Sequence, residues 1–89
     1  MPGLLWLDVG ELEPPEPLER ILTELRRLPA STALCVQHRR EPLPLYPLLA
    51  ELGFDHQCIQ HPTGAVTLYI WPQHDQTLAE FCRELRGAH

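Results

Sequence analysis

Positive charge is scarce in this sequence, and long apolar runs are missing from it. The seven basic residues are all arginine and face twelve aspartates and glutamates, so the formal net charge is −5. A protein that binds a nucleic-acid backbone or an anionic membrane surface needs a basic face to neutralise phosphates. We therefore expect neither nucleic acid nor membrane as a partner. No stretch approaches the ~20 apolar residues that a membrane-spanning helix requires.

Cysteine is also sparse. The three cysteines, Cys35, Cys58 and Cys82, are odd in number and widely spaced, whereas small secreted domains carry an even and denser set that forms disulfides. The apolar residues 4–6 have no basic region before them, which is not the pattern of a signal peptide. We expect a cytoplasmic location.

The ten prolines fall in clusters and divide the chain into segments. Four segments are short and rich in apolar residues, as strands are: residues 4–9, 32–38, 54–60 and 65–71. Three segments carry apolar residues at three- and four-residue spacing, as amphipathic helices do: residues 16–28, 45–52 and 75–86. Pro17 suits the first turn of its helix, Gly53 suits a helix C-cap, and residues 61–64 suit a hairpin turn.

This order of segments predicts a β-α-β-α-β-β-α arrangement in a single domain that spans residues 1–89. Strand–helix–strand connections are right-handed, so the first two helices should cover one face of a four-stranded mixed sheet. The predicted fold class is α/β, more narrowly an α+β two-layer sandwich. Its core covers about residues 5–71, and the helix at about residues 75–86 is an addition to it.

Residues 7–17 read Leu-Asp-Val-Gly-Glu-Leu-Glu-Pro-Pro-Glu-Pro. This segment resembles the N-terminal signature of TusA/SirA-like proteins, in which a strand ending in Leu-Asp leads to Cys-Pro-x-Pro at the start of the first helix. Residues 15–17 match the Pro-x-Pro part, and Pro14 stands where those proteins have the cysteine. Residues 38–46 are similar to an uncharacterised bacterial branch of this fold, which carries Glu-Pro-Pro-Glu-Pro in place of the cysteine motif.

In the sulfur carriers of this fold, the cysteine holds a persulfide at a helix N-terminus, where the helix dipole favours a thiolate. Proline offers no nucleophile, so sulfur relay at Pro14 is chemically excluded. The resemblance implies a small module in redox, sulfur or metal metabolism, with no cofactor. We interpret the chain as a non-catalytic domain that binds a protein or a small anion.

Two alternatives stay open. In the first, the protein is a sulfur carrier or a sulfurtransferase-like enzyme that uses a non-standard cysteine, Cys35 or Cys58. In the second, it is an oligomeric interaction module with no ligand. Against the first alternative, Cys35 and Cys58 fall in mid-strand and Cys82 falls on a helical stripe, where cysteine usually behaves as a small buried apolar residue.

The main candidate site lies where the first two strands end. Parallel strands joined by a crossover end at the same edge of a sheet, and ligands favour that edge in α/β folds. The candidate residues from the two loops are Asp8, Glu13, Glu16, His38, Arg39, Arg40 and Glu41. They predict a site for an anion or a peptide. Ion pairing and helix capping between the loops would explain the same residues without a ligand.

A metal site is not expected, although five histidines are present. His56, Cys58 and His61 crowd one segment, but alternation along a strand points His56 and Cys58 to one face and His61 to the other. No Cys-x-x-Cys or His-x-x-x-His pair is available to supply four ligands.

The two faces of the predicted sheet differ. Alternation directs one apolar set toward the helix-covered side: Leu5, Leu7, Val9, Leu34, Val36, Val66, Leu68 and Ile70. On the opposite side it places Trp6, Asp8, Cys35, Tyr69 and Trp71, which form too apolar a surface to leave exposed. We expect the helix at residues 75–86 to cover both tryptophans, either within one chain or across a homodimer, and the short link at residues 72–74 favours the homodimer. The candidate interface is therefore Trp6, Tyr69, Trp71 and Phe81.

Overall fold

The computed structural model describes residues 1–88 of the chain. Within these residues four strands form one sheet: β1 (Gly3–Asp8), β2 (Thr32–His38), β3 (Phe54–Gln60) and β4 (Val66–Pro72). Three helices accompany them in the same residues: α1 (Glu16–Arg26), α2 (Leu45–Leu52) and α3 (Gln76–Gly87). The predicted order of elements and the α+β fold with a four-stranded mixed sheet are confirmed.

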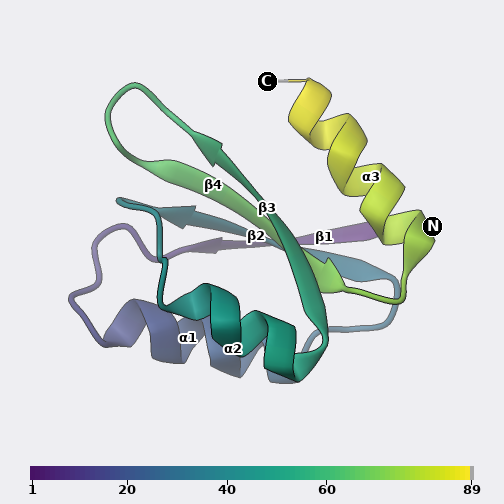
Figure 1. The fold of residues 1–89 in the computed structure, drawn as a ribbon, viewed down its shortest axis with the longest axis horizontal. Helices are drawn as coiled ribbons and strands as arrows, with labels where there is room; N and C mark the ends of the chain where they lie inside the picture. Colours follow the sequence, from purple (N-terminus) through teal and green to yellow (C-terminus); the bar gives the residue numbers. More distant parts are fainter. Residues whose placement is uncertain (89) are drawn as a thin grey trace.

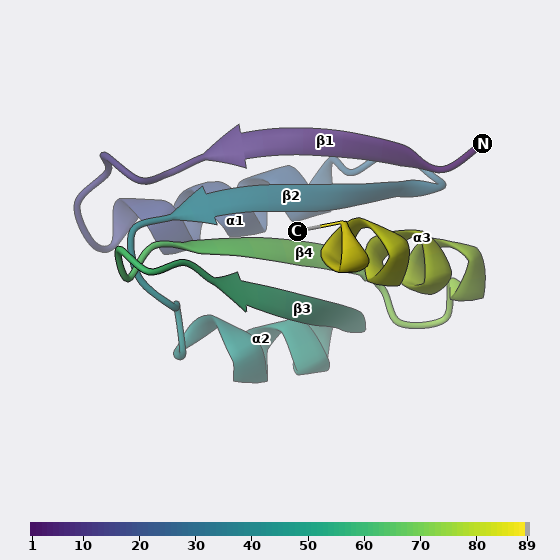
Figure 2. The ribbon, with the colours of Figure 1, turned by 90° about the horizontal axis from the view of Figure 1, so that it is seen from above.

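The strands lie in the order β1-β2-β4-β3 (Figures 1 and 2). β1 pairs with β2 in parallel, and the register places Trp6 beside Cys35. β4 runs antiparallel to both of its neighbours, so that Tyr69 lies between Cys35 and Gln57. The hairpin that joins β3 to β4 turns at Gly64, whose φ of +93° suits glycine. β2 and β4 are therefore the central strands, and β1 and β3 are the edges.

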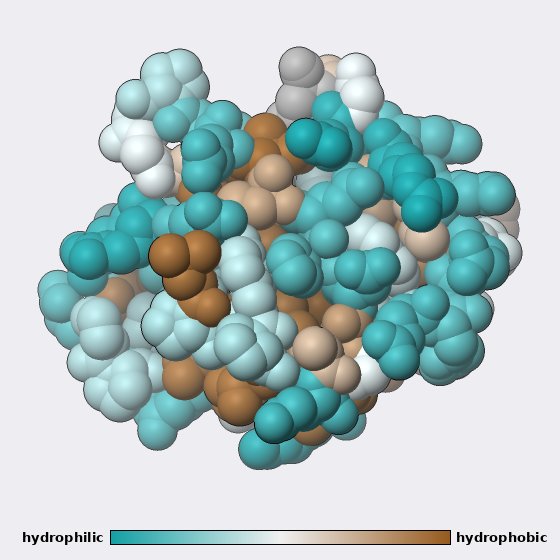
Figure 3. Space-filling view, viewed as in Figure 1, coloured by the Kyte–Doolittle hydropathy of each residue, from teal (hydrophilic) through white to brown (hydrophobic). Residues whose placement is uncertain are grey.

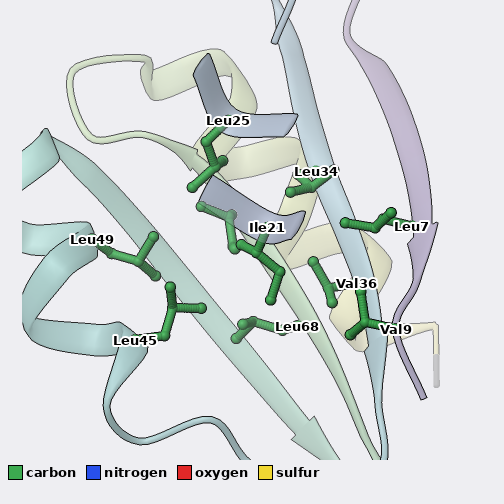
Figure 4. Packing of buried hydrophobic residues seen from close by; sticks show 10 residues of the cluster. Leu7, Val9, Ile21, Leu25, Leu34, Val36, Leu45, Leu49 and Leu68 are labelled. Atoms are coloured by element: carbon green, nitrogen blue, oxygen red, sulfur yellow. The ribbon is translucent and has the colours of Figure 1, made fainter. Parts of the chain in front are cut away.

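One face of the sheet is covered by α1 and α2, as predicted (Figure 1). Their apolar stripes project Ile21, Leu25, Leu45 and Leu49 onto side chains of the sheet (Figure 4). The buried cluster consists of those four residues with Leu7, Val9, Leu34, Val36, Leu68 and Ile70. Burial of each large aliphatic side chain contributes roughly 1.5–3 kcal/mol. This cluster holds the two helices, and the loops that precede them, against the sheet.

The opposite face is covered by α3, which packs over β4, β2 and β3 of the same chain. A second buried cluster joins this helix to the sheet: Ala33, Cys35, Tyr69, Trp71, Leu78, Ala79 and Cys82, with Ile59, Phe81 and Leu85 partly buried against it. Of the two arrangements left open, within one chain or across a homodimer, the helix covers the sheet of its own chain. The chain reverses after β4 because Gln73 N–H donates to Gly53 O at 2.9 Å and Asp75 N–H donates to Pro72 O at 3.0 Å.

α3 covers one of the two tryptophans. Trp71 on central β4 is 2% exposed, whereas Trp6 on edge strand β1 is 62% exposed. The expectation that the helix buries both rings is wrong for Trp6. The reason is strand order, since alternation puts both rings on one face but β1 lies outside the strands over which α3 packs.

The surface mixes apolar and hydrophilic residues. On the face that it views, Figure 3 shows the apolar residues in separate patches among hydrophilic ones. The exposed large apolar residues are Met1, Leu4, Trp6, Leu43 and Leu52.

No helix within residues 1–88 has both the length and the apolar character needed to cross a membrane.

Leu78→Ala should destabilise the protein, because Leu78 is fully buried between α3 and the sheet. Truncating a core leucine to alanine lowers the free energy of unfolding by about 2–5 kcal/mol. Urea unfolding followed by circular dichroism measures the loss. Leu52→Ala is the matched control, since Leu52 is 55% exposed and its truncation should change the free energy by less than about 0.5 kcal/mol. Equal losses in the two variants would contradict the packing of α3.

Candidate functional site

The loops that follow β1 and β2 meet at one edge of the sheet, because the two strands are parallel. Arg39 joins the two loops. Its Nη2 donates to the carbonyl oxygen of Leu12 at 3.2 Å and to Glu13 Oε2 at 3.1 Å. The structure thus brings together Glu13 and Arg39, which are 26 residues apart in the sequence.

A pocket of about 300 Å³ opens between these loops and the first turns of α1 and α2. The two loops and the start of α1 lie at the left of Figure 1. Its walls are apolar and rich in proline: Leu12, Pro14, Pro15, Pro17, Leu18, Ile21, Pro42, Pro44 and Leu45. Four polar residues complete the lining, namely His38, Arg39, Arg40 and Glu41. The volume suits a small ligand, at the lower end of the range of about 300–1,000 Å³ for ligand pockets.

Positive charge at the pocket comes from two arginines in different situations. Arg39 forms an ion pair with Glu13 in which both side chains are exposed, so the pair contributes little to stability. Arg40 is exposed, and its guanidinium makes no hydrogen bond or ion pair with any residue in 1–88. The donors of Arg40 are therefore available to a ligand.

His38 is a half-buried member of the lining. Its Nδ1 accepts a hydrogen bond from the backbone N–H of Arg40 at 3.3 Å, which requires a neutral ring with its proton on Nε2. Burial, together with the charges of Arg39 and Arg40, lowers the pKa of His38 below its ordinary value of 6.5. At neutral pH the ring is an uncharged donor, and a nearby anion would favour its protonation.

Glu41 ties the second loop to α2 and β3. Its Oε2 accepts from the hydroxyl of Tyr46 at 2.7 Å, and its Oε1 accepts from Nε2 of Gln60 at 3.1 Å. The ring of Tyr46 stacks on His56 with the two centroids 4.0 Å apart. Burial and the hydrogen bond to Glu41 raise the pKa of Tyr46. Both carboxylate oxygens of Glu41 are thus engaged within the protein.

Three sequence-predicted site residues lie outside the lining. Asp8 Oδ1 accepts from the N–H of Gly10 at 2.9 Å and stabilises its own turn. Glu16 is exposed on the first turn of α1, and Glu13 reaches the site only through Arg39. The sequence pattern also missed the walls, because it identifies the prolines of both loops only as breakers. The prolines are concentrated at the ends of two parallel strands, and this concentration is the sequence signal that could have predicted the apolar walls.

The thiols are poorly placed for chemistry. Cys35 and Cys82 are fully buried, and Cys58 is half-buried on β3. Burial raises the pKa of all three, that of Cys82 to about 11, so the reactive thiolate is disfavoured at neutral pH. None of the three lines the pocket. Among residues 1–88 no three His, Cys, Asp or Glu side chains form a group that could hold a metal ion.

A model of a protein family, described as an uncharacterised conserved protein, matches residues 6–72 of the chain. The match contains every residue that lines the pocket and ends before α3. No curated protein and no solved structure matches the chain. The resemblance to TusA/SirA-like proteins stays a prediction.

The native protein should accept no sulfur from a cysteine desulfurase and a sulfur donor, because two of its thiols are buried, the third is half-buried and all three have a raised pKa. Mass spectrometry under denaturing, non-reducing conditions would detect a persulfide. An alkylating reagent should label all three thiols once the chain is unfolded, which is the internal control. A persulfide that forms on the native protein and disappears in Cys58→Ser would contradict this expectation and support a sulfur carrier.

Proposed function

This chain belongs to the DUF2249 family of uncharacterised conserved proteins, and we propose that it is a non-catalytic binding module for a small organic anion. The anionic group lies beside Arg40 and His38, and the apolar body of the ligand lies against the proline-rich walls. One observation carries the proposal: a pocket of about 300 Å³ combines apolar walls with a guanidinium that has no partner within residues 1–88.

Charge and shape both favour such a ligand. A guanidinium donates two parallel hydrogen bonds to a carboxylate, sulfonate or phosphate group, a geometry that lysine does not offer. Although the whole chain carries a net charge of −5, the pocket lining has two cations, Arg39 and Arg40, and one carboxylate, Glu41. Proline fixes its own φ and has no N–H, so the walls are rigid and apolar, and binding orders few groups.

The resemblance to TusA/SirA-like sulfur carriers supports the same location. It places the carrier cysteine of those proteins at Pro14, and Pro14 lines the pocket. We propose a bacterial, cytoplasmic TusA/SirA-like module that uses this edge of the fold for binding and lacks its sulfur chemistry. A role in redox, sulfur or metal metabolism is what the resemblance implies.

Alkyl sulfonates test the proposal, because a sulfonate stays ionised at every pH at which the protein is handled. Hexanesulfonate should bind more tightly than methanesulfonate, by up to about fourfold for each methylene that enters the pocket. Isothermal titration calorimetry at constant ionic strength measures both affinities. Arg39→Ala combined with Arg40→Ala should weaken hexanesulfonate binding by about tenfold or more, since a hydrogen bond to a charged group contributes about 1.5–3 kcal/mol.

Two further variants separate the pocket from the overall charge. Arg83→Ala with Arg86→Ala removes the same charge from exposed positions on α3 and should leave the affinity unchanged. Glu13→Gln should raise the affinity, because it frees Arg39 from its ion pair. Equal weakening by both arginine pairs, or no binding of either sulfonate to the wild type, would refute the proposal.

His38 should make both stability and binding depend on pH. Its folded pKa is lowered below 6.5, so the unfolded chain binds more protons than the folded protein in that window. Stability should therefore fall as the pH drops through about 6.5 toward the folded pKa. A bound sulfonate favours the protonated ring, so its affinity should rise over the same window. Thermal melts and titrations of the wild type and His38→Gln measure both effects, and identical pH profiles would exclude His38 from the site.

A further inference from the structure

β1 is an edge strand, and its outer side pairs with no other strand in residues 1–88. On its inner side, alternate residues bond to β2, as Gly3 does when its N–H donates to Ser31 O at 2.8 Å. The residues between them direct their backbone N–H and C=O groups outward from the sheet. These outward residues are Leu4, Trp6 and Asp8.

This edge lacks the usual protection against pairing with another chain. Edge strands of soluble proteins carry lysines, prolines or bulges that block such pairing, whereas β1 reads Gly-Leu-Leu-Trp-Leu-Asp. Leu4 and Trp6 are 40% and 62% exposed. β3, the other edge strand, differs because it exposes polar side chains, Asp55 and Gln60.

α3 leaves this edge uncovered. The helix packs over β4, β2 and β3, and Figure 2 shows β1 beyond it at the margin of the sheet. A tryptophan side chain presents roughly 150–250 Å² of surface. Trp6 and Leu4 therefore form an apolar strip directly beside unpaired backbone groups.

We infer that β1 pairs with β1 of a second copy of this chain, antiparallel and with Trp6 on the twofold axis. The two sheets then form one continuous sheet of eight strands, four from each copy. The Trp6 side chains of the two copies then lie beside each other on the same face of the sheet. The inference is independent of the ligand pocket, none of whose lining residues lies on β1.

The spacing of the outward residues makes β1 complementary to itself. In an antiparallel pair, outward residues face outward residues, and each such pair makes two hydrogen bonds. Trp6 opposite Trp6 places Leu4 opposite Asp8, so that all three outward residues are paired by about six hydrogen bonds. A shift of the pairing register by one residue would place outward backbone N–H and C=O groups opposite inward ones. A shift by two residues would leave some outward backbone groups without a partner.

The same register keeps the charges of the strand apart. Asp8 is the charged residue of β1. Its two copies lie four positions apart along the paired strands, roughly 13 Å at about 3.3 Å per residue. That separation exceeds the screening length of about 8 Å at physiological ionic strength. The two Trp6 rings become cross-strand neighbours, and an aromatic pair of this kind is stabilising beyond its buried area.

Sedimentation velocity on the full chain tests the inference. Two paired six-residue strands bury an area at the low end of specific interfaces, so the dimer should dissociate on dilution. The weight-average mass should therefore shift from one copy to two as the protein concentration is raised. The exposed indole of Trp6 should also become less solvent-accessible over the same range, which a blue shift of the tryptophan emission would report.

Two variants address the two parts of the contact. Leu4→Pro removes an outward N–H that β2 does not use, and an edge strand tolerates proline at such a position. Trp6→Lys replaces an exposed ring by a charge. Both variants should keep the circular dichroism spectrum of the wild type and require at least about tenfold higher concentration to associate. Leu52→Lys replaces a leucine on α2 that is 55% exposed, between the values for Leu4 and Trp6, and should dimerise like the wild type.

A wild-type chain that stays monomeric at the highest concentration would overturn the inference. So would a dimer that persists unchanged in both Leu4→Pro and Trp6→Lys, because its interface would then lie elsewhere. Arg39→Ala with Arg40→Ala should dimerise normally, so a failure of sulfonate binding and a failure of dimerisation are distinguishable.

Discussion

β2 pairs with β4 at the centre of the sheet, and both strands are buried on both of their faces. β2 buries Leu34 and Val36 toward α1 and α2 but Ala33 and Cys35 toward α3, and β4 divides its residues in the same way. Neither face can stay open, because each would expose a larger apolar surface than soluble proteins leave bare. The two crossover connections supply helices to one face only. The other face is covered by the segment that follows β4, and β1 and β3 are left at the edges.

The same arrangement decides what the candidate pocket is made of. Because β1 joins β2 in parallel, the proline-rich loops after both strands lie at one edge of the sheet. Their prolines can neither extend the strands nor supply backbone N–H groups, which hold anions in many other loops. The prolines therefore shape the walls, and in the proposed anion site the recognition of charge depends on His38, Arg39 and Arg40. Since these side chains follow directly from the end of a central strand, the sheet itself fixes where the charge lies.

Periodicity in the sequence is sufficient to predict the elements, since β2, β3 and α2 begin and end where their apolar patterns do. It is not sufficient to predict how the sheet is covered. Alternation assigns Trp6 and Trp71 to the same face, but strand order decides that one ring is central and the other is at the edge. That order depends on contacts between residues distant in the sequence, which no local pattern contains. The meeting of parallel strand ends does predict that Glu13 and Arg39 approach each other. The pattern that identifies Pro14 as a strand breaker does not predict that Pro14 lines a pocket.

The burial that stabilises the sheet also separates the thiols from the positive charge. A nucleophilic cysteine needs exposure and a cationic neighbour to hold it as a thiolate. Cys35 and Cys82 share an apolar cluster, and the nearby carboxylate of Glu41 adds to the burial that raises the pKa of Cys58. The cations that could stabilise a thiolate, Arg39 and Arg40, lie instead around the pocket. Pro14 lies in the same lining and has no thiol. Within residues 1–88, no thiol lines the pocket, and no cationic side chain contributes to the pKa shifts of the three thiols. This separation supports the proposal that the pocket binds an anion rather than transferring sulfur.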